Sequence, residues 1–127
     1  MNQPNRLQGQ AVLPMMRQIS GGLIVSVSSA AVQLPDASGV AYQASKHGLN
    51  GLALATRVEE QVHGIRTTIL CPGLCDTDIL NRRLQPPSRE TLDKALVPQD
   101  IADAILFLAS LPPRATVPIL QVMPAQL

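Results

Sequence analysis

Tyr42 and Lys46 are four positions apart in a stretch rich in small residues, so a helix there would place both side chains on one face. A phenol titrates near pH ~10, too high to exchange protons readily at neutral pH. A neighbouring ammonium lowers that value because it favours the phenolate. Tyr42 is therefore a candidate general acid-base for a carbonyl or alcohol oxygen. Ser29 follows a short apolar run and is a candidate to hydrogen-bond the same oxygen where charge develops.

Three predicted strands would position these side chains. Residues 23–28 and 65–70 (IRTTIL) are short runs rich in β-branched and other apolar residues, typical of strands that are covered on both faces. Residues 117–122 (VPILQV) are a further candidate, although Pro118 weakens the pattern. A strand, a long helix and a second strand form a βαβ unit. We therefore predict an α/β fold, part of a doubly wound, Rossmann-like parallel sheet with three strands and flanking helices.

Helices are predicted for residues 7–19, 39–62 and 98–110. Pro14 should kink or end the first, and Pro98 suits the first turn of the last. The middle helix should end at Gly64. Glycine inside a helix costs about 1 kcal/mol relative to alanine, so we expect another element to approach this helix closely. Its small residues are Ala41, Ala44, Ser45, Gly48, Gly51, Ala53 and Ala55.

Composition narrows the function classes. The 127 residues fit one domain, residues 1–127, and the 46% hydrophobic content suffices for an ordinary core. Ten basic and nine acidic residues give a net charge of +1 without a like-charge block. With only 2% aromatic residues, the chain lacks the charge and the stacking surface that nucleic-acid binding requires. No run approaches the roughly 18 apolar residues of a membrane span, so neither nucleic acid nor membrane is an expected partner.

The cysteines and histidines do not indicate a metal site. Cys71 and Cys75 flank a Pro-Gly pair, and His47 and His63 lie far from them along the chain. A tetrahedral zinc site would need four such ligands at suitable spacing. We predict no metal and interpret the cysteines as a buried thiol at a strand end and a loop residue. A secretory signal is not visible after Met1, which favours a cytoplasmic setting.

Four motifs together resemble the short-chain dehydrogenase/reductase family. They occur in the family's order and span nearly the whole chain, since residues 98–102 (PQDIA) are also similar to the start of the family's last large helix. The motifs are residues 24–31 (IVSVSSAA), 41–46 (AYQASK), 64–66 (GIR) and 71–73 (CPG), the last followed by Thr77-Asp78.

The resemblance implies a role for each matched residue. Ser29, the second serine of its pair, matches the catalytic serine, and Tyr42 matches the acid-base. Lys46 matches the residue that lowers the phenol's pKa and holds the nicotinamide ribose. The loop that contacts the nicotinamide and pyrophosphate is matched by Pro72, Gly73 and Thr77, with Leu74 and Cys75 expected to contribute backbone groups. The implied activity is reversible hydride transfer between NADP or NAD and a small carbonyl or alcohol substrate. The implied assembly is a homo-oligomer that pairs through the 39–62 helix.

One departure from the family pattern is large. The family opens with a strand and a glycine-rich turn that seats the pyrophosphate at a helix amino terminus, and no such motif occurs in the 127 residues. We therefore interpret the chain as the carboxyl-terminal, catalytic half of such an enzyme, truncated before residue 1. That truncation would leave one edge of the first strand unpaired, which invites association.

Other interpretations remain open. A tyrosine four positions before a lysine is common on helix surfaces, and Thr77-Asp78 could be an ordinary helix cap. Arg82 and Arg83 would either be exposed to solvent or bind an anionic substrate. The alternative for the whole chain is an inactive fragment that acts, if at all, by associating with a full-length relative.

Overall fold

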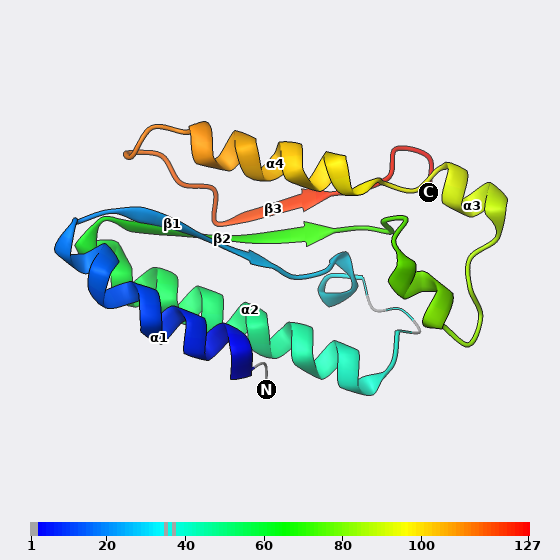
Figure 1. Ribbon diagram of the computed structural model, residues 1–127, viewed down its shortest axis with the longest axis horizontal. Coiled ribbons are helices and arrows are strands. Elements are labelled where there is room, and N and C mark those ends of the chain that lie inside the picture. The colour runs from blue at the N-terminus through cyan, green and yellow to red at the C-terminus, as the bar shows by residue number, and fades with distance from the viewer. Residues whose placement is uncertain (1–2, 35, 37) are drawn as a thin grey trace.

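A computed structural model describes residues 3–34, 36 and 38–127, with the side chains of residues 3–7 outside that description. The chain alternates helices and strands and ends on a short strand (Figure 1). The helices are α1 Gln3–Gln18, α2 Val40–Glu60, α3 Arg89–Asp93 and α4 Pro98–Ser110, with 3-10 turns η1 Ala30–Val32, η2 Gln61–His63 and η3 Asp78–Arg82. The strands are β1 Gly22–Val27, β2 Ile65–Pro72 and β3 Ile119–Val122.

The sheet is parallel, in the order β1-β2-β3. Gly22 pairs with Ile65 and Val27 with Leu70, while Ile69 pairs with Ile119 at the start of β3. Figure 1 shows α4 on one face of the sheet and α1 with α2 on the other. This arrangement confirms the predicted α/β fold with a three-stranded parallel sheet flanked by helices. Among the described residues, no strand pairs with the outer edge of β1.

The central strand, β2, is buried along most of its length. Ile65 and residues 67–71 are buried, because helices cover both faces of this strand. On one face, Ile69 and Cys71 pack in a cluster with Ala53 of α2. On the other, the Thr68 hydroxyl donates to the Val117 carbonyl at 2.7 Å and fixes the segment that leads into β3. Of the small residues of α2, Ala53 is the one that is buried against β2. Gly48 and Gly51 are exposed, and a Cβ at either would meet nothing within 4 Å, so the close approach expected at these glycines was wrong.

The element bounds differ from the predicted ones at both ends of the chain. Helix α1 begins at Gln3, earlier than the predicted residue 7, and it continues past Pro14 to Gln18, one residue before the predicted end. Proline removes one intrahelical hydrogen bond, but the four residues after it still complete a turn. β3 is limited to Ile119–Val122 because Pro118 has no N–H to donate to a ladder. The 76–96 segment contains two short helices, η3 and α3.

Gly64 lies between η2 and β2, where the chain enters the second strand of the βαβ unit. Its φ of +72° lies in the left-handed region that glycine tolerates, and a Cβ there would be 2.8 Å from the Ser20 carbonyl oxygen. The end of η2 is therefore in contact with the turn between α1 and β1. This close approach fixes where β2 begins beside β1.

An ion pair attaches α1 to α2. Glu60 is 2% exposed, and the Arg17 Nε donates to its Oε2 at 2.8 Å, while a second guanidinium nitrogen contacts Oε1. The hydrogen bond from Arg17 holds the pKa of Glu60 below its ordinary value of 4.5, against the opposing effect of burial. The pair therefore stabilises the fold while the carboxylate is ionised.

We expect this pair to make stability depend on acid. Because the folded-state pKa of Glu60 is lowered, its contribution is complete above pH 4.5 and is lost as the pH falls through the folded value. Glu60→Gln should lower the urea midpoint at pH 7 and flatten its fall below pH 4.5. Glu59→Gln changes the charge equally on an exposed neighbour and is the matched control. Equal midpoints and acid profiles for both variants would rule out the role of the pair.

Candidate functional site

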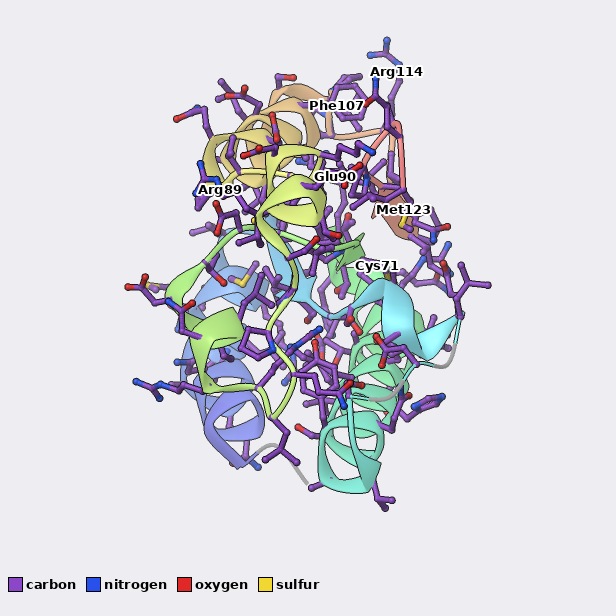
Figure 2. The ribbon with its side chains drawn as sticks, turned by 90° about the vertical axis from the view of Figure 1, so that its right-hand side faces the viewer. Cys71, Arg89, Glu90, Phe107, Arg114 and Met123 are labelled. Atoms are coloured by element: carbon purple, nitrogen blue, oxygen red, sulfur yellow. The ribbon has the colours of Figure 1, made fainter. Side chains whose placement is uncertain are left out.

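A cavity of about 310 Å³ opens at the carboxyl ends of β1 and β2. Figure 2 looks onto these strand ends, with Cys71 in the interior and Met123 at the end of β3. Seven of the eight predicted site residues line the cavity, namely Ser29, Tyr42, Pro72, Gly73, Leu74, Cys75 and Thr77, and only Lys46 does not. Segments far apart in the sequence therefore meet at one edge of the sheet, as parallel strands require.

Ser28 and Ser29, which follow β1, use their hydroxyl groups in different hydrogen bonds. Ser28 Oγ donates to Asn50 Oδ1 on α2, which uses its proton in the interior. Ser29 Oγ instead accepts from the Ala31 N–H at 3.1 Å, as the cap of η1. This bond uses a lone pair of the Ser29 oxygen and leaves its proton available to an acceptor in the cavity. The geometry therefore favours Ser29 over Ser28 as a donor to a bound oxygen.

Tyr42 and Lys46 lie on consecutive turns at the start of α2. The Lys46 Nζ is 5.8 Å from the centroid of the Tyr42 ring, within the range of a cation-π contact. It also donates to the Val27 carbonyl at 3.1 Å, so it is held against the end of β1. Burial lowers the pKa of Lys46. The ammonium is thus close to the Tyr42 ring, although Lys46 itself does not line the cavity.

Backbone contacts shape the 72–77 loop. The Gly73 N–H donates to the Val122 carbonyl at 2.7 Å, and a Cβ at this glycine would be 2.8 Å from the Pro124 Cδ. Any side chain at this position would therefore push the loop away from β3. Further along, Cys75 forms a parallel bridge with Leu96, and the Asp76 N–H donates to the Leu96 carbonyl at 2.7 Å. The loop is fixed at both ends, and Thr77 caps η3 without a side-chain hydrogen bond.

Sequence reasoning missed several residues that line the same cavity. Asp36, which precedes α2, is one of them. Arg83, which follows η3, also lines the cavity and is one of the two arginines that the sequence offered for an anionic substrate. A hydrogen bond from Ser38 lowers the pKa of Asp36, and the charge of Arg83 contributes to the shift. The apolar wall adds Leu34, Ile79, Leu80 and Met123. Ile79 and Leu80 were detectable as apolar residues within a polar segment, whereas Met123 carried no signal.

The described part of the chain contains no group of three or more His, Cys, Asp or Glu placed to hold a metal ion. Burial raises the pKa of both Cys71 and Cys75 and so disfavours reactive thiolates. The described helices also include none that is long and apolar enough to cross a bilayer. What the cavity offers is a phenol, a hydroxyl and a nearby ammonium, a set suited to proton transfer to an oxygen.

Comparison with known proteins gives a consistent result. Residues 7–87 match the family described as short chain dehydrogenase. The chain is 37% identical over 105 residues to a short chain dehydrogenase/reductase of Aspergillus oryzae, a match that covers 76% of this chain and 40% of the relative. It is 31% identical over 110 residues to a 7alpha-hydroxysteroid dehydrogenase of Clostridium sardiniense, covering 82% and 42%.

Solved structures agree with the sequence matches. The fold superposes on serine dehydrogenase from Escherichia coli with a TM-score of 0.78 and 26% identity, covering 95% of this chain and 48% of that one. A closed form of serine dehydrogenase complexed with NADP+ gives a TM-score of 0.76 and 28% identity, covering 89% and 48%. The chain therefore spans less than half the length of these relatives.

Proposed function

The chain belongs to the short-chain dehydrogenase family, and from this membership we propose that its protein is an NAD(P)-dependent oxidoreductase acting on a carbonyl or alcohol. The observation that supports the proposal most directly is the single cavity lined by Ser29, Tyr42 and the 72–77 loop, with Lys46 against the tyrosine. We further propose that residues 1–127 are the carboxyl-terminal, catalytic half of that enzyme.

The size of the cavity limits what this half would bind. Ligand sites typically enclose about 300–1,000 Å³, so 310 Å³ has room for a nicotinamide ring and a small substrate and not for a whole dinucleotide. The absence of a glycine-rich turn in the sequence agrees with this. Under the proposal, the adenosine and pyrophosphate contacts belong to the other half, and Gly73 lets the loop backbone approach the nicotinamide end.

Tyr42, Ser29 and Lys46 would have different roles in the reaction. The bound cofactor supplies or accepts the hydride. Tyr42 gives its proton to the carbonyl oxygen during reduction and removes it from the alcohol during oxidation. Ser29 donates a hydrogen bond to the same oxygen and stabilises the charge that develops there. Lys46, already held between the Val27 carbonyl and the Tyr42 ring, keeps positive charge beside the phenol and contacts the ribose.

The alternative proposal, an inactive fragment that associates with a full-length relative, has support from exposed apolar surface. Leu54 and Val58 of α2 are 43% and 62% exposed, and β1 has no neighbour on its outer edge among the described residues. The same α2 surface would serve a homo-oligomer of an active enzyme. Activity, and not association, therefore separates the two proposals.

Turnover by a longer protein tests the proposed function. Residues 1–127 can be joined behind the amino-terminal half of the Clostridium relative, and oxidation of NADPH and NADH can be followed with a panel of ketones and aldehydes. We expect saturable turnover with at least one substrate. A folded chimera that binds NADPH and yet reduces no carbonyl and oxidises no alcohol would contradict the proposal and favour the inactive fragment.

We also expect Arg83 to select substrates with an acidic group. It lines the cavity and Arg82 does not, so Arg83→Gln should raise KM for a 2-oxo acid by about fivefold, the upper range for an exposed ion pair. KM for the methyl ester of the same acid should not change. Arg82→Gln removes the same charge outside the cavity and should affect neither substrate. Equal effects of the two variants on the acid would rule out this role for Arg83.

A further inference from the structure

A second, smaller cavity lies at the opposite end of the sheet from Tyr42. Its volume is about 140 Å³, and it is formed by the end of α2, the start of β2 and the loop that precedes β3. Its lining residues are Arg57, Gln61, Gly64, Ile65, Arg66, Thr67, Pro113, Arg114, Ala115 and Thr116. None of the proposed catalytic residues reaches this cavity.

Two residues that line this cavity each carry a buried donor without a hydrogen-bond partner in the described structure. In the described part of the chain, only Arg57 Nε and Thr67 Oγ1 are buried side-chain polar atoms without one, and both residues line the cavity. Thr67 is 1% exposed, so its hydroxyl cannot turn to bulk water. Buried polar groups in folded proteins are almost always satisfied. Both atoms can donate, so an acceptor that enters the cavity would satisfy them. Thr67 also lines a larger cavity between α1, β1 and α2.

The charge of the lining indicates an anionic acceptor. Three arginines contribute to the cavity and no aspartate or glutamate does. The buried carboxylate of α2, Glu60, is paired with Arg17. A guanidinium pairs well with oxoanions because its planar N–H groups match two of their oxygens.

The three arginines differ in position. Arg66 donates to the carbonyl oxygen of Ala115 at 3.1 Å, with longer contacts to Leu111 and Pro112, so it fixes the loop that forms the wall. Arg114 lies at the outer edge of the molecule (Figure 2) and contributes long-range charge at the rim. Arg57, with its buried unpaired Nε, is the arginine that can contact a ligand inside.

We propose that this cavity binds a small oxoanion, such as phosphate or sulfate, through Arg57 Nε and the Thr67 hydroxyl. A water molecule occupies about 30 Å³ in the liquid, so 140 Å³ has room for about four waters or for one such anion with a water. The site is independent of the oxidoreductase proposal, since it shares no residue with the Tyr42 cavity.

Titration of the purified chain tests the site. The ¹⁵N-labelled protein is titrated with inorganic phosphate, sulfate or AMP, at an ionic strength held constant with sodium chloride, while the Arg57 Nε–H resonance is followed. We expect a saturable shift with phosphate and with sulfate. A similar shift with AMP would identify phosphate esters as ligands, and its absence would restrict the site to free inorganic anions.

Substitutions at Arg57 and Thr67 test whether their unpaired donors bind the anion. Arg57→Gln should weaken phosphate binding at least about tenfold, as expected for loss of a hydrogen bond to a charged group. Thr67→Val should weaken it several-fold while keeping the side chain's shape. Arg82→Gln, which removes one charge outside the cavity, is the matched control and should bind as the parent does.

Two results would overturn the proposal. One is an Arg57 Nε–H resonance in the unmodified protein that responds no more to phosphate or sulfate than to chloride, which would mean that the cavity holds water only. The other is unchanged affinity in Arg57→Gln, which would place the anion elsewhere. Because the first result needs no substitution, the test does not depend on whether the variants fold.

Discussion

Tyr42→Phe is expected to lower kcat by about 10²–10⁴-fold in a protein that combines residues 1–127 with an amino-terminal half, the usual cost of losing a general acid-base. The variant loses one hydroxyl and keeps the ring, so the contact of Lys46 with the aromatic face remains possible. Cofactor affinity should therefore change little. The loss would be confined to proton transfer at the substrate oxygen.

Steady-state turnover and NADPH titration of the same preparations measure the two effects separately. Ser28→Ala is the matched control, since Ser28 also lines the cavity while its hydroxyl is bonded to Asn50. It should retain most of the activity that Ser29→Ala loses. Comparable turnover by Tyr42→Phe and its parent, with a carbonyl substrate that both accept, would remove Tyr42 from the mechanism.

Lys46→Ala should give the second largest loss, because one ammonium is proposed to hold the ribose and to favour the phenolate. We expect weaker cofactor binding together with a pH-rate profile shifted to the alkaline side. Removing the side chain also leaves the Val27 carbonyl without its donor at the end of β1. Lys46→Arg keeps the charge and should recover part of the profile.

The pH-rate profiles of Lys46→Ala and Lys46→Arg separate the two roles. Weaker cofactor binding with an unshifted profile would leave Lys46 as a ribose contact alone. An unshifted profile with unchanged cofactor binding would assign it a structural role, through the Val27 carbonyl.

The sequence predicted the fold well because its signals are local. Apolar runs in residues 23–28 and 65–70 and the small residues of the 39–62 stretch each encode one element, and the parallel order follows from their alternation. The bounds were less accurate at the start of α1, which begins at Gln3 and not at residue 7, and at the start of β3. β3 begins only after Pro118, which has no N–H to donate to a ladder.

The cavities depend on contacts that no local pattern encodes. Asp36 and Arg83 are distant in sequence and meet because η1 and η3 both follow strand ends at the same edge of the sheet. Arg57 and Thr67 look like an ordinary helix arginine and an ordinary strand threonine. Only the burial of both donors beside one cavity distinguishes them.

The central claim is that residues 1–127 carry the catalytic groups while most of the cofactor affinity belongs to the other half of the enzyme. Fluorescence titration with NADPH and NADH tests it most directly, using the purified 127-residue chain and the chimera in parallel. We predict saturable binding by the chimera and none at micromolar concentrations by the chain alone, because ordering a flexible dinucleotide would offset the few contacts at its nicotinamide end. Saturable micromolar binding by the 127-residue chain would contradict the account.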